Sequence, residues 1–133
     1  MSTLRTNALE GVDAKNSITI VAGAGNITTT NVQEGLCKAW VHVHDNASID
    51  DSFNISTIED VSTGSIKTTY SNNMGNEHYT GSGLARTSSS GDDGNLRYSN
   101  VFSTSQTRYI VMNSSGTSTD AETQTMTTHG DLA

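Results

Sequence analysis

The sequence predicts an all-β fold, in which a short extended N-terminal arm precedes a small antiparallel β-sandwich. Thr, Val, Ile and the few aromatic residues occur in short runs, and stretches rich in Gly, Asn and Ser separate these runs. β-branched and aromatic side chains favour strands, whereas Gly and Asn accept the positive φ angles of turns. The one helical candidate, 32–39, is interrupted by Gly35.

The first 34 residues differ from the rest of the chain in composition and in the regularity of their pattern. Residues 1–34 are more polar and less regular, and we expect them to form an arm or attachment segment with short strands at 17–21 and 27–30. Residues 35–133 are expected to form the sandwich head, because several short strands with turn residues between them are typical of this architecture.

The expected head strands follow the alternation of a half-buried strand. Residues 38–44 place one set of side chains on one face, Ala39, Val41 and Val43, and another set on the opposite face, Trp40, His42 and His44. In the next strand, Phe53 and Ile55 are predicted to share a face. The remaining strands are expected at 65–70, 96–102, 108–112 and 123–128.

The chain is short of apolar residues. Thr, Ser, Asn and Gly supply 62 of its 133 residues, whereas Leu, Ile, Val and Phe supply 24. So low an apolar content is also found in disordered, Ser/Thr-rich polypeptides. The strand pattern and the absence of proline favour a folded chain, and one copy then buries too little surface to offset the entropy of ordering it. We therefore expect an obligate oligomer.

The formal charge of −7 excludes several classes of protein. The seven Lys and Arg residues are scattered, whereas nucleic-acid binding needs a clustered basic surface. The sequence also has no apolar run of about 20 residues and no apolar N-terminal stretch of a signal peptide, so we expect a soluble protein made in a cytoplasm. Cys37 is the only cysteine and is expected to pack as a small apolar side chain. We expect no cofactor.

Two motifs resemble a known family. The segment 29–41 reads TTNVQEGLCKAWV, and 49–58 reads IDDSFNISTI. They are similar to the GLxKAWV and DSFN(V/I)S motifs of tail-fibre and virion structural proteins of marine bacteriophages. The close match covers about thirty residues, and a looser one covers most of the chain.

This resemblance implies a homotrimeric β module on the outside of a virion, with no enzymatic activity. The arm would attach it to other virion proteins of the tail, fibre or capsid. A capsid decoration or head-fibre protein is the alternative within this class. The residues expected in the core or at the trimer contact are Leu36, Trp40, Val41, Val43, Phe53 and Ile55.

The alternating histidines suggest a second interpretation. His42 and His44 lie about 7 Å apart on one face of a strand, and three copies around an axis would offer six imidazoles to a metal ion. We favour the simpler interpretation that they line a partly buried face near Trp40. Trp40 itself could stack on a sugar, but a lone Trp among alternating apolar residues more often anchors a core or an interface.

Surface carboxylates and loops complete the candidates. Four carboxylates lie beside turns and are expected to be solvated: Asp50, Asp51, Glu59 and Asp60. Their solvation disfavours the catalytic pair of carboxyl groups that a glycosidase needs.

A glycan-binding receptor module is the alternative from another class of function, because loops on a rigid scaffold often carry binding residues. Its expected receptor residues are Asn72, Asn73 and Asn76 in the loop 72–77, Asp92 and Asp93 in the loop 88–95, and Tyr79.

Overall fold

The structure, a computed structural model, describes Thr6, Ala8 and residues 19–21, 29–31, 35–45, 47–87 and 93–133. The chain divides into two units, Met1–Leu36 and Cys37–Ala133. In the first unit, β1 (Thr19–Val21) pairs antiparallel with β2 (Thr29–Asn31). In the part of the chain that is described, no helix could span a membrane.

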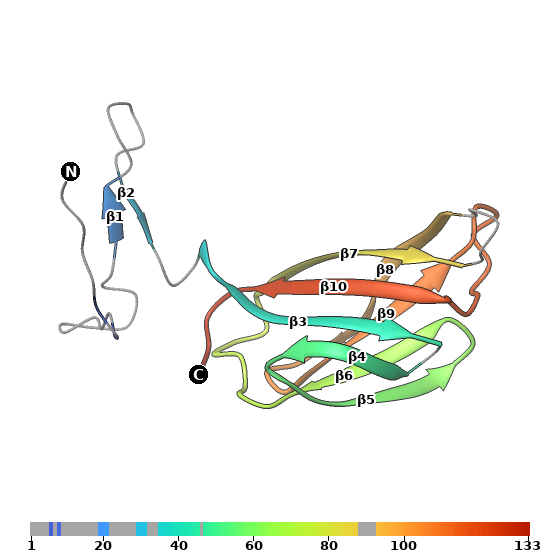
Figure 1. The fold of residues 1–133 in the computed structure, drawn as a ribbon, viewed down its shortest axis with the longest axis horizontal. Coiled ribbons are helices and arrows are strands. Elements are labelled where there is room, and N and C mark those ends of the chain that lie inside the picture. Colours follow the sequence, from blue (N-terminus) through green and yellow to red (C-terminus); the bar gives the residue numbers. More distant parts are fainter. Residues whose placement is uncertain are drawn as a thin grey trace. The chain divides into compact units, whose positions relative to one another are not determined.

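The second unit is a sandwich of two four-stranded antiparallel sheets (Figure 1). The first, here the β3 sheet, has the order β4-β3-β10-β7: Ser48–Phe53, Cys37–His44, Thr123–His129 and Thr80–Arg86. The second, the β6 sheet, has the order β5-β6-β9-β8: Ile55–Ser62, Ser65–Tyr70, Gln106–Met112 and Asp93–Phe102. The two sheets join at one corner, where Ala85 and Arg86 of β7 pair with Gly94 and Asp93 of β8. The predicted β-sandwich is confirmed.

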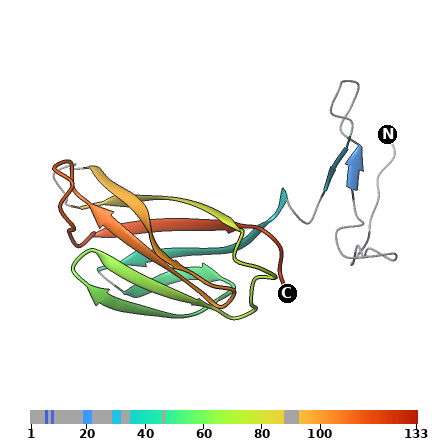
Figure 2. The ribbon, with the colours of Figure 1, turned by 180° about the vertical axis from the view of Figure 1, so that it is seen from behind.

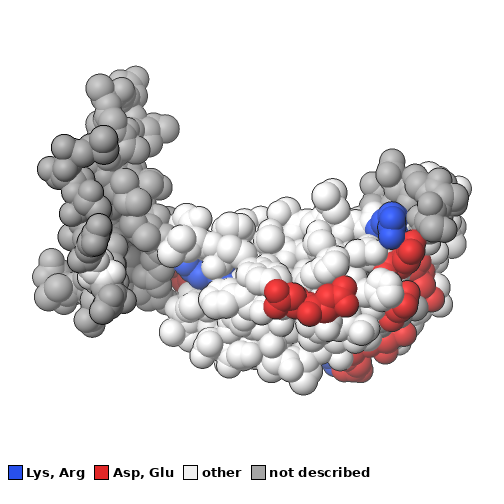
Figure 3. Space-filling view, viewed as in Figure 1, with Lys and Arg blue, Asp and Glu red and all other residues white. Residues whose placement is uncertain are grey.

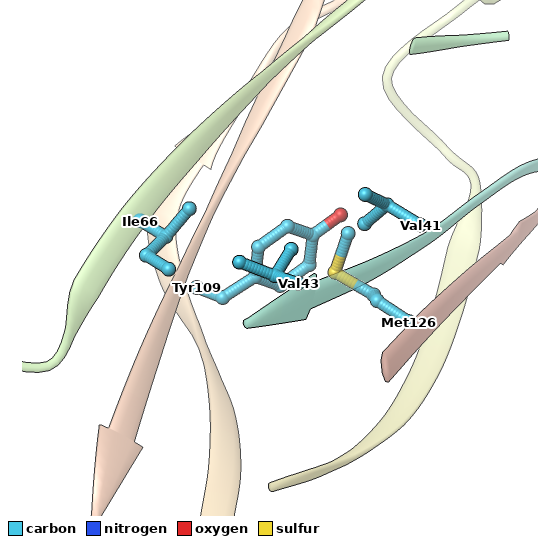
Figure 4. Close-up of a cluster of buried hydrophobic side chains, with 5 residues drawn as sticks. All are labelled: Val41, Val43, Ile66, Tyr109 and Met126. Carbon is cyan, nitrogen blue, oxygen red and sulfur yellow. The ribbon is translucent and has the colours of Figure 1, made fainter. Parts of the chain in front are cut away.

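The core lies between the sheets and is formed by alternate residues of the inner strands. Figure 4 shows one cluster, in which side chains of β3, β6, β9 and β10 meet: Val41, Val43, Ile66, Tyr109 and Met126. A second cluster includes two residues of the 71–79 loop, Met74 and Tyr79, which pack with Ala39 and Tyr70. Small and hydroxylated residues complete the interior, since Thr68, Thr107 and Thr128 are fully buried.

Asn54 is the junction at which the chain passes from one sheet to the other. It is the single residue between β4 and β5, and its φ of 58° lies in the left-handed region that asparagine tolerates better than most residues. Its Nδ2 donates hydrogen bonds of 3.0 Å to the carbonyls of Lys38 and Asn72, and its Oδ1 accepts a 2.7 Å bond from the Asn72 amide. The side chain therefore ties β3 and the 71–79 loop to this sharp turn.

This junction corrects one sequence prediction. Phe53 and Ile55 do not share a face of one strand, because the turn at Asn54 places them in different sheets. Phe53 ends β4 and is 51% exposed, whereas Ile55 begins β5 and packs against the core.

The sandwich has two different ends (Figures 1 and 2). Cys37 and Ala133 lie at one of them, here the terminal end, together with the 71–79 loop, whose Asn73 carbonyl accepts a hydrogen bond of 2.9 Å from the Ala133 amide. The opposite, far end carries the end of β3 at His44, the turn 63–64 and the 113–122 loop. There, the Gly64 amide donates a bond of 2.6 Å to Oδ1 of Asp120.

Candidate functional site

The outer face of the β3 sheet is the most distinctive surface of the sandwich. As predicted, Ala39, Val41 and Val43 of β3 are buried, and the alternation leaves Trp40, His42 and His44 on the opposite face. Cross-strand pairing then arranges the outward side chains of all four strands in rows.

The first row contains the two large aromatic residues of this face. Trp40 is paired with Phe53 of β4 on one side and with Thr127 of β10 on the other, and Thr127 is paired with Ser82 of β7. Phe53 is half exposed, and Trp40 is only partly buried. Ser82 Oγ and Thr127 Oγ1 lie 3.0 Å apart in a hydrogen bond. The row is therefore apolar toward β4 and hydroxylated toward β7.

The second row ends on a protruding leucine. It runs from Asp51 through His42 and Thr125 to Leu84. Leu84 is 78% exposed, the highest value among the large apolar residues that the structure describes as exposed. An open groove of about 350 Å³ lies beside it toward Arg86, and another of about 340 Å³ lies toward Ser82.

Charged groups are distributed unevenly across this face. On the β4 side, His42 Nδ1 lies 3.2 Å from Asp50 Oδ2, and on the β7 side, Arg86 Nη2 lies 3.2 Å from Glu122 Oε1. Acidic side chains are visible over the face and toward the far end in Figure 3. Exposed pairs of this kind contribute little to stability, but they give the β4 side acidic groups and the β7 side a guanidinium.

The two histidines have different carboxylate neighbours. His42 faces Asp50, whereas His44 Nδ1 lies 3.2 Å from Asp45 Oδ2 in the following turn. Among the described residues, no group of three or more His, Cys, Asp and Glu side chains is arranged to hold a metal ion. The single chain therefore brings the histidines together only as an alternating pair on β3.

The four carboxylates considered for a glycosidase lie on two sheets. Asp50 and Asp51 are on β4, whereas Glu59 and Asp60 are on β5, where Glu59 forms an ion pair with Lys67. All four residues are exposed. Exposed carboxylates divided between two sheets do not form the facing pair that a glycosidase needs.

Of the two predicted receptor loops, only 72–77 lies wholly within the described residues. Asn72, Asn73 and Asn76 are exposed on the 71–79 loop at the terminal end. Asp92 lies outside the described residues, and of Asp93 only its position at the start of β8 is described. Asn72, Asn73 and Asn76 are therefore the receptor candidates that the structure describes as exposed.

Tyr79 corrects the expectation of an exposed receptor residue. Its side chain is only 8% exposed, because it packs edge-on against Tyr70 and also contacts Phe102. Its hydroxyl donates hydrogen bonds of 3.1 Å to the carbonyls of Ser103 and Gln106. These contacts make Tyr79 part of the core.

The residues predicted for the core or the trimer contact are found in three kinds of place. Val41 and Val43 are in the core, and Ile55 packs against it. Trp40 and Phe53 lie on the outer face of the β3 sheet, and Leu36 belongs to the first unit and is 57% exposed.

Sequence reasoning missed β7 and its exposed Leu84. The inward positions of β7 are Gly81, Gly83 and Ala85, which supply no apolar alternation from which a strand could be recognised. A Cβ at Gly83 would lie 2.2 Å from the Thr125 carbonyl oxygen and 2.5 Å from Cδ2 of Leu96. Gly83 thus has to be a glycine because the β10 backbone and Leu96 already fill the space.

Comparisons with protein-family models, curated proteins and solved structures found no match to this chain.

Proposed function

We propose that the chain is a structural surface protein of a bacteriophage virion, of the tail-fibre type, that works as a homotrimer without catalysing a reaction. The first unit, with residues 1–34 as its main part, would attach the protein to other virion proteins. The sandwich would form the exposed head.

The observation that carries the proposal is the structural role of the segment resembling phage virion proteins. Its GLCKAWV part leads into β3, where Lys38 and Ala39 are buried and Trp40 points outward. Its DSFNIS part contains Asn54, which makes the turn from β4 into β5. These motif residues thus build the sandwich and its outer face, as expected for a motif that specifies a structural module.

The solution mass tests the assembly directly. Light scattering on the full chain is expected to give three chain masses, and circular dichroism of the same sample should show a β-rich spectrum. A mass of one chain at every concentration tested would refute the trimer.

The position on the virion needs a separate measurement. Mass spectrometry of purified virions, followed by immunogold labelling with an antibody against the sandwich, is expected to place the protein on the tail fibre. Label on the head would favour the alternative of a capsid decoration or head-fibre protein. Absence of the protein from purified virions would refute the proposal.

Glycan recognition is the second candidate, and the exposed Asn72, Asn73 and Asn76 favour it because three amide side chains on one loop can hydrogen-bond sugar hydroxyls. A glycan array is expected to show saturable binding that is lost when all three residues are replaced by Ala. An array without saturable binding would remove this candidate.

A further inference from the structure

The two outer faces of the sandwich differ in how far their large apolar side chains are exposed. On the β6 sheet, the outward residues Glu59, Lys67 and Arg108 lie side by side in one row, and Glu59 forms an ion pair with Lys67. On the β3 sheet, the outward residues include the chain's one Trp, one of its two Phe and the exposed Leu84. Ile110 and Met112 also point outward on the β6 sheet, but both are only partly exposed, whereas Leu84 is 78% and Phe53 51% exposed. The β3 sheet therefore exposes large apolar side chains that this chain has in short supply.

We propose that the outer face of the β3 sheet is a contact between copies of this chain, in which the β7 side of one copy meets the β4 side of the next. This inference rests on the proposed self-assembly and names the surface that carries it. Leu84 of one copy packs against Phe53 and Trp40 of its neighbour, and Arg86 of the first copy approaches Asp51 of the second.

Charge and spacing support this pairing of the two sides. On β7, the apolar Leu84 is followed two residues later by the basic Arg86, and on β4, the apolar Phe53 lies two residues from the acidic Asp51. Both separations are about 7 Å along a strand. Each side therefore offers one apolar and one charged group at the same spacing. Arg86 already pairs with Glu122 of its own chain, and the five donors of its guanidinium allow it to bridge Glu122 and Asp51 of the next copy.

The strand directions decide how the copies are related. β4 is antiparallel to β3, β3 to β10, and β10 to β7, so β4 and β7 run in opposite directions. The step from Phe53 back to Asp51 and the step from Leu84 on to Arg86 consequently point the same way, toward the far end. A rotation axis along the sandwich preserves this direction, and such a head-to-tail contact closes into a ring.

The register sets the tilt of the strands in this ring. Leu84 lies in the row of Asp51, and Phe53 lies in the row of Ser82, one row nearer the terminal end. The two sides are three strand spacings apart, about 14 Å, and the rows are about 7 Å apart. A tilt of roughly 30° between the strands and the axis brings Leu84 level with Phe53, close to the tilts that occur in β-barrels.

A matched pair of substitutions tests the face. Leu84→Glu and Ile110→Glu each replace an outward apolar residue by an acid, on the β3 sheet and on the β6 sheet respectively. Sedimentation of the full chain over a range of concentrations is expected to show assembly weakened by about 10- to 100-fold for Leu84→Glu. The Ile110→Glu variant is expected to assemble as the unsubstituted chain does, and circular dichroism checks that both variants fold.

A cross-link tests the head-to-tail geometry. In a Cys37→Ser background, the double variant Phe53→Cys/Leu84→Cys is expected to give covalent rings on a denaturing gel under oxidising conditions. Within one chain the two positions lie on the outer strands of a four-stranded sheet, too far apart for a disulfide. The variant with Leu84→Cys alone is expected to stay uncross-linked, whereas a two-fold contact would cross-link it.

The outcomes separate this inference from the proposed function. Assembly that is unaffected by Leu84→Glu would overturn the proposed contact through the outer face of the β3 sheet. A double variant that forms no covalent ring would do the same, and both results leave the virion proposal standing. A chain that stays monomeric without any substitution would overturn both the face and the proposed trimer.

Discussion

Replacing Asn54 tests the junction between the two sheets. The Asn54→Ala variant loses the bonds from Nδ2 to the Lys38 and Asn72 carbonyls and the bond that Oδ1 accepts from the Asn72 amide. At about 1 kcal/mol each, these bonds sum to about 3 kcal/mol of unfolding free energy. Alanine also tolerates the φ of 58° less well, which adds about 1 kcal/mol. We therefore expect a total loss of about 4 kcal/mol.

Asn54→Gly separates the two contributions. Glycine loses the same hydrogen bonds but accepts the left-handed backbone freely, so we expect it to be about 1 kcal/mol more stable than Asn54→Ala. Urea unfolding followed by circular dichroism measures both variants, and Asn73→Ala, an exposed residue of the loop that Asn54 contacts, serves as the control. A loss below 1 kcal/mol for Asn54→Ala would show that the junction does not depend on this side chain.

Two further predictions concern the interior. Gly83→Ala is expected to destabilise the sandwich by about 1–3 kcal/mol in urea unfolding, because its Cβ would collide with the Thr125 carbonyl and Leu96, whereas Gly35→Ala, with open space around it, should be neutral. Burial, reinforced by the nearby Tyr109, raises the pKa of Tyr70 above the usual tyrosine value. Stability should therefore fall as pH rises above about 10, where the unfolded chain releases this proton, and Tyr70→Phe should lose less stability over that range; an equal loss in both proteins would refute this account.

The alternation within single strands was readable in the sequence. In β3, buried Ala39, Val41 and Val43 alternate with the more exposed Trp40, His42 and His44, because successive side chains of a strand point to opposite faces. The all-β class and the approximate positions of most strands followed in the same way. These features depend on local backbone geometry, which each short segment carries in its own residues.

Other features depended on which segments meet in space. The sequence does not reveal β7, because its inward residues are small. Gly83 is one of them, and the β10 backbone and Leu96 occupy the space that its side chain would need. Tyr79 ends a polar loop, yet it is buried because Tyr70 at the end of β6 and Phe102 at the end of β8 pack against its ring. Neither neighbour can be found from the residues next to Tyr79.

The sequence by itself determined the strand-forming runs, the shortage of apolar residues and the two motifs that suggest a virion protein. Only the tertiary structure decided that Trp40, Phe53 and Leu84 share one outer face, because cross-strand pairing brings together residues of separate strands. The turn at Asn54 decided that Phe53 faces outward while Ile55 packs against the core. Strand propensity is a local property, whereas the composition of a sheet face depends on register, and long-range packing selects that register.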